Sequence, residues 1–267
     1  MEHQDSNQDF DTGALSVLRL CLTQSLTHTQ EVREFVTKYL VQAGRGVEQL
    51  PGGCLFSPGT REDAIVMVAH MDTVWSGRSR ESVVADVAEQ AGILYSARPG
   101  IGIGADDRAG IGAIFNMLDL GHSVLLTDDE EIGMLGSRAL RISQHPVFER
   151  LQQHQFMLQL DRMGMNDFKC YNVGTDEFRA YVQTRTGLTE PNRHSFTDIC
   201  SLCRDIPGAN VSIGYYNEHS SREILVIDEW LTQVRRLRKW LADPLPRFLL
   251  PVQEHPAESI TDIWPGL

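Results

Sequence analysis

Histidine and acidic side chains recur at the ends of apolar segments in this chain of 267 residues. The residues concerned are His70, Asp72, Asp106, Glu130, Glu131, Asp161 and His219, in the segments VMVAHMDTVW, GIGADDRAG, LLTDDEEIG, MLQLDRMG and GYYNEHSSRE. Each segment is either an apolar run that ends in a residue type able to bind metal ions, or a glycine-rich turn that carries such a residue. An open α/β sheet collects such side chains at the carboxyl ends of its strands. The pattern favours the site of a two-metal hydrolase.

His70 and Asp72 are two residues apart, so in an extended segment their side chains point to the same side. Asp72 can then hold the far ring nitrogen of His70, which sets the tautomer of the ring and raises its basicity. A histidine at a strand end beside an aspartate can also be purely structural. This pair alone does not decide between the two interpretations.

Asp106 follows the run GIGIGA and precedes Asp107. Repeated glycines let the backbone approach a charged group closely. A dinucleotide-binding loop is the competing interpretation, but the run lacks the GxGxxG spacing, and two aspartates would repel a pyrophosphate. The segment therefore favours a metal ion, and we expect no nucleotide cofactor.

Glu130 and Glu131 are adjacent, so their side chains diverge. One can ligate a metal while the other faces the substrate as a general base, and a base beside a metal-activated water generates hydroxide near neutral pH. The alternative is an acidic helix start, because carboxylates favour that end of the helix dipole. Asp161 and His219 carry only weak signals of their own.

The charges of the candidate ligands suggest that they act together. Asp106, Glu131 and Asp161 contribute three negative charges, whereas His70 and His219 contribute none. Two divalent cations and one bridging hydroxide would make this cluster neutral. Mixed histidine and carboxylate ligation suits zinc, with manganese or cobalt as possible substitutes. We therefore expect two Zn²⁺ ions as cofactors.

Strands and helices are expected to alternate around these residues. Near-continuous apolar runs predict buried strands at 64–70, 123–127 and 156–160, and shorter signals predict strands at 54–56, 93–96 and 209–216. Helical periodicity covers 14–26, 29–44, 109–120, 132–142, 196–204 and 226–243. Residues 168–184 alternate enough for one or two strands. The pattern predicts an α/β fold with a mixed, mostly parallel central sheet and helices on both faces, which places the candidate ligands at one sheet edge.

The chain is expected to hold one catalytic domain at 13–243, between a disordered N-terminus at 1–12 and a proline-rich tail at 244–267. The polar, acidic start does not resemble a signal peptide, and no apolar run is long enough to span a membrane. Five cysteines, an odd number, argue against a disulfide framework. We therefore predict a cytoplasmic protein with reduced thiols, in which Cys200 and Cys203 form a buried pair rather than a zinc or redox motif.

The net charge of −12 argues against a nucleic-acid surface. The basic run RRLRK at 235–239 is expected to be a solvated helix face. Two weaker candidates lie near the predicted site: Tyr215 or Tyr216 could stabilise an oxyanion or simply pack beside the sheet. Asp198 could contact a substrate amine, although a cap on the following helix is the favoured interpretation.

Together these motifs resemble the co-catalytic di-zinc exopeptidases, which include bacterial leucyl-type aminopeptidases, tripeptidase-like enzymes and glutamate-carboxypeptidase-like enzymes. The resemblance covers residues 64–223 and rests on His70-Met-Asp72, Gly104-Ala-Asp106-Asp107, Glu130-Glu131, Asp161 and His219. It implies a three-layer zinc-exopeptidase-like sandwich in which Asp106 bridges two metals. His70 and Asp161 would hold one metal, and Glu131 and His219 the other. Glu130 would be the general base, Asp72 would orient His70, and the Asp106–Asp107 peptide would be cis.

The spacing of the last two ligands departs from one branch of that family. The carboxypeptidase-like enzymes insert a lid domain between them, whereas only 57 residues separate Asp161 from His219 here. The chain is therefore closer to the aminopeptidase branch and is expected to lack the lid.

The sequence thus predicts a metallo-exopeptidase that cleaves a terminal peptide bond, with aminopeptidase activity favoured. The alternatives are a deacylase or amidohydrolase of a small N-acyl substrate, and a metal-binding protein without catalysis. The expected partners are a peptide or small amide substrate and, as an open possibility, further copies of the chain, without nucleic acid or membrane.

Overall fold

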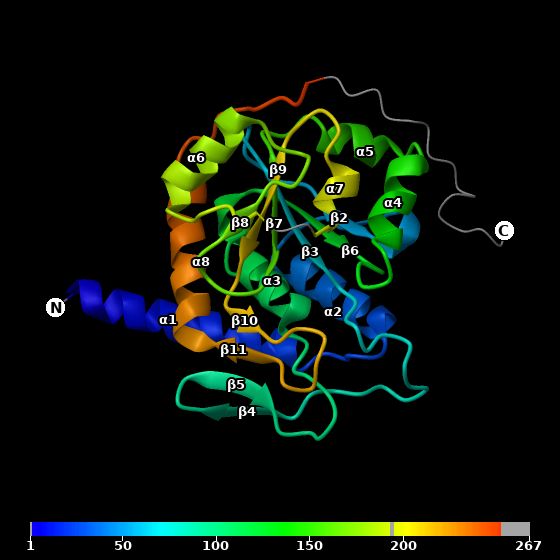
Figure 1. Ribbon diagram of the computed structural model, residues 1–267, viewed down its shortest axis with the longest axis vertical. Coiled ribbons are helices and arrows are strands. Elements are labelled where there is room, and N and C mark those ends of the chain that lie inside the picture. Colours follow the sequence, from blue (N-terminus) through cyan, green and yellow to red (C-terminus); the bar gives the residue numbers. More distant parts are fainter. Residues whose placement is uncertain (1, 193–194, 252–267) are drawn as a thin grey trace.

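The computed structural model describes residues 2–192 and 195–251 (Figure 1). Its centre is a sheet of seven strands in the order β1-β2-β6-β3-β7-β9-β8. The middle strands β6, β3, β7 and β9 run parallel, whereas the outer strands pair antiparallel. The strands are β1 Glu48–Gln49, β2 Leu55–Ser57, β3 Val66–His70, β6 Ser123–Thr127, β7 Met157–Arg162, β8 Phe168–Lys169 and β9 Gly208–Ser212. This mixed, mostly parallel sheet confirms the predicted fold class.

Helices cover both faces of this sheet, which explains why its central strands are apolar throughout. Along β3, Met67 and Ala69 enter one apolar cluster while Val66 and Val68 enter the other. The first cluster includes side chains of α1, α2, α3, α6 and α8, and the second includes side chains of α4, α5 and α7. The helices are α1 Glu2–Leu22, α2 Thr29–Gln42, α3 Ala105–Phe115, α4 Leu135–Ile142, α5 Pro146–Leu151, α6 Asp176–Thr186, α7 Ile199–Leu202 and α8 Ile227–Ala242, with short 3-10 turns at Pro51–Gly53 and Leu118–Leu120.

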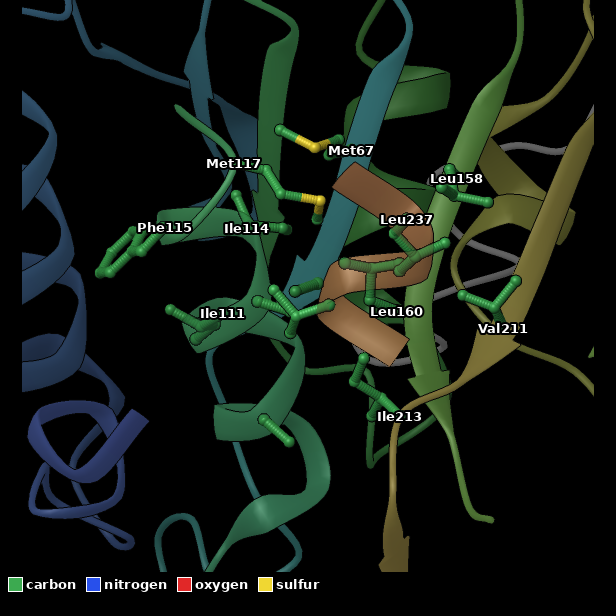
Figure 2. Close-up of a cluster of buried hydrophobic side chains, with 14 of the residues drawn as sticks. Met67, Ile111, Ile114, Phe115, Met117, Leu158, Leu160, Val211, Ile213 and Leu237 are labelled. Atoms are coloured by element: carbon green, nitrogen blue, oxygen red, sulfur yellow. The ribbon is translucent and has the colours of Figure 1, made fainter. Parts of the chain in front are cut away.

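The larger cluster fixes α3, which begins with the candidate bridging aspartate. Figure 2 shows Ile114 of α3 and the following Met117 beside Met67 of β3, with Leu237 of α8 near Leu160 of β7. All five side chains are buried. The start of α3 is therefore held against the carboxyl ends of β3 and β7.

A second, antiparallel sheet joins four short strands in the order β10-β11-β5-β4. They are β4 Val87–Gln90, β5 Ile93–Ser96, β10 Tyr215–Tyr216 and β11 Ile224–Val226. This sheet lies at the bottom of Figure 1. It confirms the strand expected at 93–96 and carries the loop 217–223 between β10 and β11.

Residues 168–184, predicted as one or two strands, form only the short strand β8 and most of helix α6. Helical signals outweigh the apparent alternation. Thr175 accepts a hydrogen bond from the backbone N–H of Phe178, and Gly187 ends the helix with a left-handed φ of 71°. Phe178 and Val182 are buried four residues apart, which is helical spacing. The strand prediction is confirmed only for β8 and is wrong for the part that forms α6.

Helix α1 begins at Glu2, so it extends into the segment 1–12 for which the sequence predicts disorder. Phe10 packs partly against the core, and Ala14 and Leu18 continue the same face at four-residue spacing. Asp11 pairs with Arg235 of α8 at 2.5 Å. The helical spacing therefore starts earlier than the predicted residue 14.

The first part of the proline-rich tail packs along the body of the protein. Leu245, Phe248 and Leu250 are at most 9% exposed. The backbone N–H of Leu245 donates to Asp63, and that of Phe248 donates to the carbonyl of Gln155. The rest of the predicted tail, 252–267, lies outside the described residues. Within the part that the structure describes, no helix has the length and apolar character needed to cross a membrane.

Candidate metal centre

The candidate residues meet at one edge of the central sheet because four of them lie at or just after the ends of adjacent parallel strands. His70 ends β3, Asp161 lies at the end of β7, and the pair Glu130-Glu131 follows β6. Strand β3 is paired with both neighbours. Parallel register therefore brings residues that are up to 91 positions apart to the same edge, as the sequence predicted.

Asp106 reaches this edge from the start of α3. Gly104 before it adopts a left-handed φ of 67°, which glycine accepts without steric cost. The peptide bond between Asp106 and Asp107 is cis, as the family resemblance predicted. His219 lies on the loop between β10 and β11, with a φ of 60°.

The carboxylate of Asp106 lies between two histidines. Its Oδ1 is 3.0 Å from Nε2 of His70, and its Oδ2 is 3.1 Å from Nε2 of His219. Asp161 Oδ1 is 3.6 Å from the same nitrogen of His70, and Glu131 Oε2 is 3.0 Å from that of His219. The structure thus forms two histidine–carboxylate groups that share Asp106.

Asp72 holds the first histidine and the glutamate pair together. Its Oδ1 lies 3.3 Å from Nδ1 of His70. The same carboxylate accepts the backbone N–H groups of Glu130 and Glu131, both at 3.1 Å. Asp72 is 1% exposed. One buried carboxylate therefore sets the position of two neighbouring strand ends.

Asp161 is anchored by three donors. Tyr215 donates its hydroxyl to Oδ1 at 3.1 Å, and Thr197 and Gln159 donate to Oδ2 at 2.9 and 3.1 Å. Tyr215 is thus part of the site, whereas the hydroxyl of Tyr216 donates to Glu229 at 2.6 Å. Of the two tyrosines considered as oxyanion stabilisers, only Tyr215 lies at the cluster.

Burial shifts the pKa values of the acidic side chains in the cluster. Burial raises the pKa of Glu130 well above its usual range, and the charge of Asp161 acts in the same direction. Burial also raises the pKa of Asp161 and Glu131, against hydrogen bonds from the histidines. For Asp106, hydrogen bonds from His219 and His70 outweigh burial and hold its pKa below the usual range. This concentration of buried carboxylates favours bound positive charge.

The donor set fits divalent cations. Ligand atoms of His70, Asp106 and Glu131 lie within 4.8 Å of one another, as do those of His70, Asp107 and Asp161. Among the described residues, Glu131 Oε1 is buried without a hydrogen-bond partner, which leaves a lone pair for a cation. Histidine nitrogen with carboxylate oxygen is a ligand set that zinc accepts.

Asp107 is less suited than Asp106 to a shared ligand. Its Oδ2 accepts the backbone N–H of His70 at 3.2 Å, and its Oδ1 accepts that of Gly110 at 3.0 Å. Both oxygens therefore already serve the backbone, and Asp107 ties α3 to the end of β3.

A cavity of about 220 Å³ opens beside the cluster. Asp106, Glu130, Asp161 and His219 line it on one side, and the apolar part of its lining includes Met163 and Phe196. Phe196 is 74% exposed, although it precedes the anchored Thr197. The site can therefore receive a ligand from solvent directly against the acidic cluster.

Asp198, considered as a helix cap, takes a different role. No hydrogen bond from its side chain caps α7, and its Oδ2 accepts the hydroxyl of Thr127 at the end of β6. The capping prediction was wrong because the carboxylate is fully buried behind the strand ends. Of the CxxC pair, Cys203 is buried, Cys200 is partly exposed, and both are free thiols.

Glu223 is a residue of the site that sequence reasoning missed. Its carboxylate accepts the backbone N–H groups of Gly104 and Asp106. The sequence gives only a faint signal for it, a glutamate four residues after His219 and immediately before an apolar segment. Its partner is 117 positions away, so only the tertiary structure reveals the contact.

Comparison of the sequence with protein-family models and with curated proteins finds no match. Solved structures, however, share the fold. The aminopeptidase PepT of Bacillus cereus superposes with a TM-score of 0.66 at 13% identity, covering 87% of this chain and 98% of that one. A tripeptidase of Staphylococcus aureus gives 0.67 at 12% identity, covering 87% and 98%. The TET1 peptidase of Pyrococcus horikoshii gives 0.60 at 15% identity, covering 87% and 100%.

Proposed function

We propose that the protein is a two-metal hydrolase that releases residues from the amino terminus of peptides. It shares its fold with solved structures of an aminopeptidase, a tripeptidase and the TET1 peptidase. The observation that carries the proposal is the position of Asp106. Its two carboxylate oxygens lie 3.0 and 3.1 Å from the histidines of two separate ligand groups. A carboxylate placed in this way can bridge two cations, with His70 and Asp161 on one side and Glu131 and His219 on the other.

Two bound divalent cations, zinc in the first place with manganese or cobalt as substitutes, would polarise the substrate carbonyl and lower the pKa of a water molecule. The chain supplies the remaining functions. Glu130 lines the cavity and can take a proton from water and pass it to the leaving amine. Its backbone is held by Asp72, so the base has a defined position relative to the ligands. Tyr215 donates a hydrogen bond to Asp161 and so limits the movement of this carboxylate.

The charges around the cavity favour a free amino group over a carboxylate on the substrate. The charges of Asp106 and Asp161 would be compensated by the bound cations, which leaves Glu130 and Glu218 as the acidic side chains of the lining. Arg162 also lines it, but its guanidinium pairs with Asp167 at 2.7 Å and is therefore largely neutralised. An acidic cavity attracts the ammonium group of a peptide and repels a terminal carboxylate.

Incubation of the zinc-loaded protein with a mixed peptide library, followed by mass spectrometry, tests this function. Half of the peptides carry blocked amino termini, and the set includes N-acyl amino acids as substrates of the alternative deacylase. Stepwise loss from free amino termini alone is the expected result. Loss from carboxyl termini would instead place the enzyme among carboxypeptidases, and cleavage of N-acyl amino acids only would favour the deacylase.

Glu130→Gln is the matched control, because it keeps the shape of the side chain and removes the base. We expect it to bind two equivalents of zinc and to lose roughly 10²–10⁴-fold in turnover. Near wild-type turnover of this variant would show that Glu130 is not the base. Absence of cleavage by a zinc-replete wild type would favour the third alternative, a metal-binding protein without catalysis.

Assembly into a homo-oligomer is a further part of the proposal. The TET1 peptidase of Pyrococcus horikoshii, which shares the fold, can assemble into a tetrahedron or an octahedral shell. Light scattering coupled to size-exclusion chromatography measures the molecular mass of the protein in solution. A mass of one chain, 30.0 kDa, would contradict assembly.

A further inference from the structure

Glu223 connects two ligand-bearing segments that come from different parts of the chain. Its Oε2 accepts the backbone N–H of Gly104 at 2.7 Å, and its Oε1 accepts that of Asp106 at 2.9 Å. The side chain is 3% exposed. Each carboxylate oxygen thus holds one N–H of the turn that presents the shared aspartate.

The loop that ends at Glu223 also carries His219. Asn217 and His219 both have positive φ angles, 58° and 60°, a conformation that is uncommon outside glycine and is adopted most readily by residues such as Asn and His. Within the loop, Ser220 donates to the carbonyl of Asn217 at 2.7 Å, and the N–H of Glu223 donates to the carbonyl of Ser220. The loop is therefore internally closed, and the Glu223 carboxylate joins it to the turn before α3.

The two segments are in close contact at Gly102. A Cβ added to Gly102 would lie 2.5 Å from Glu223 Oε2 and 2.7 Å from the carbonyl of Ser220. Gly104 likewise has no space for a side chain, because a Cβ there would lie 2.3 Å from Leu26. The absence of a side chain at Gly102 thus leaves the space that the Glu223 carboxylate occupies.

From this geometry we infer that Glu223 is a positioning residue that fixes Asp106 and His219 relative to each other. The inference rests on the proposed two-metal site, in which these two residues hold one cation together with Glu131. Partners that orient metal ligands typically change affinity by 10–100-fold when they are altered. Glu223 does not line the cavity described above, so its influence reaches the cation only through the two ligands it holds.

Glu223→Gln removes one of the two acceptors while keeping the size of the side chain. The new amide NH₂ must face one of the two backbone N–H groups, so that hydrogen bond is lost. Asp63→Asn is a matched control remote from the cluster. Asp63 also accepts a backbone N–H, from Leu245 at 2.8 Å, and its other partner is Arg61. Glu223→Asp keeps both oxygens on a shorter stem and serves as the conservative variant.

Titration of the metal-free proteins with Co²⁺, followed by visible absorption and calorimetry, measures the effect. We expect the wild type to bind two equivalents, and Glu223→Gln to bind one of them about 10–100-fold more weakly. His219→Ala identifies which step belongs to the His219 side. Glu223→Asp should recover part of the affinity, and Asp63→Asn should bind Co²⁺ as the wild type does. Wild-type affinity in Glu223→Gln would overturn the inference and leave the proposed function intact.

Hydrogen–deuterium exchange of the metal-free proteins gives a readout that needs no cation. In Glu223→Gln we expect faster exchange in both 102–107 and 217–223, whereas Asp63→Asn should leave these segments unchanged. Unchanged exchange in the Glu223→Gln protein would show that the carboxylate does not hold them, and would overturn the inference. Failure of the wild type to bind any Co²⁺ would instead contradict the two-metal function, and with it the role of Glu223 at a cation.

Discussion

Replacement of His122 by glutamine should reduce the pH dependence of stability. His122 is fully buried immediately before β6. Its Nδ1 accepts the backbone N–H of Ile65 at 3.3 Å, and its Nε2 lies 3.0 Å from the carbonyl of Leu241. This arrangement requires a neutral ring with the proton on Nε2. A second proton would place an N–H against the N–H of Ile65.

Burial lowers the pKa of His122 from the usual 6.5 to about 4, and the Leu241 carbonyl only partly offsets this effect. The nearby charges of Arg61 and Arg45 lower this pKa further, whereas the charge of Asp63 raises it. The unfolded chain therefore takes up a proton near pH 6.5, while the folded protein stays neutral down to about pH 4. The stability that this histidine contributes is present above pH 6.5 and is lost as the pH falls toward 4. At ~1.4 kcal/mol per pKa unit, the loss amounts to about 3 kcal/mol.

Denaturant unfolding of metal-free wild type and His122→Gln at pH 7.5 and pH 4 tests this linkage. The amide of glutamine can retain the donor and the acceptor but cannot titrate. The free energy of unfolding of the wild type should fall by about 3 kcal/mol more than that of the variant between the two pH values. Other titrating groups are common to both proteins and cancel in the difference. An equal loss in both proteins, or an NMR titration that places His122 near pH 6.5, would refute the reasoning.

Two further substitutions test other parts of the structure. Asp72→Asn should lower zinc affinity about 10–100-fold, because the amide cannot accept hydrogen bonds from His70 and from both backbone N–H groups. Competition with a chromophoric chelator measures this affinity. Unchanged affinity would show that these contacts do not orient the ligands. Phe178→Ala should cost about 3–5 kcal/mol in denaturant unfolding, because the ring is fully buried with Phe156 and Phe248 at centroid distances of 5.3 and 5.1 Å. A loss below about 1 kcal/mol in the second case would mean that α6 is not packed as described.

The local sequence was sufficient where one short segment carries both a structural signal and a chemical one. The run before His70 is apolar at every position because β3 is buried on both faces, and the histidine marks its end. The same logic located Asp161 and the pair Glu130-Glu131. The glycines before Asp106 indicated a close backbone approach, and the resemblance correctly predicted the cis bond that follows it.

Contacts between distant segments could not be predicted in this way. The side chain of Asp198 has the type and position of a helix cap, yet it is buried against Thr127, 71 positions away. Residues 168–184 alternate like a strand, but packing of Phe178 and Val182 on the core favours the helix. Tyr215 and Tyr216 are indistinguishable by type. Successive side chains of strand β10 point to opposite faces, so the first reaches Asp161 and the second reaches Glu229.

The sequence by itself determined which strands are buried and which residues are available as ligands, because apolar patterning and side-chain chemistry are local properties. Only the tertiary structure decided how those residues meet. Asp106 is placed between His70 and His219 by the parallel register of the sheet and by the packing of α3, and Glu223 reaches Asp106 across 117 positions. Distances of about 3 Å between residues so remote in sequence depend on all the tertiary contacts of the fold together, and no single segment of the sequence encodes them.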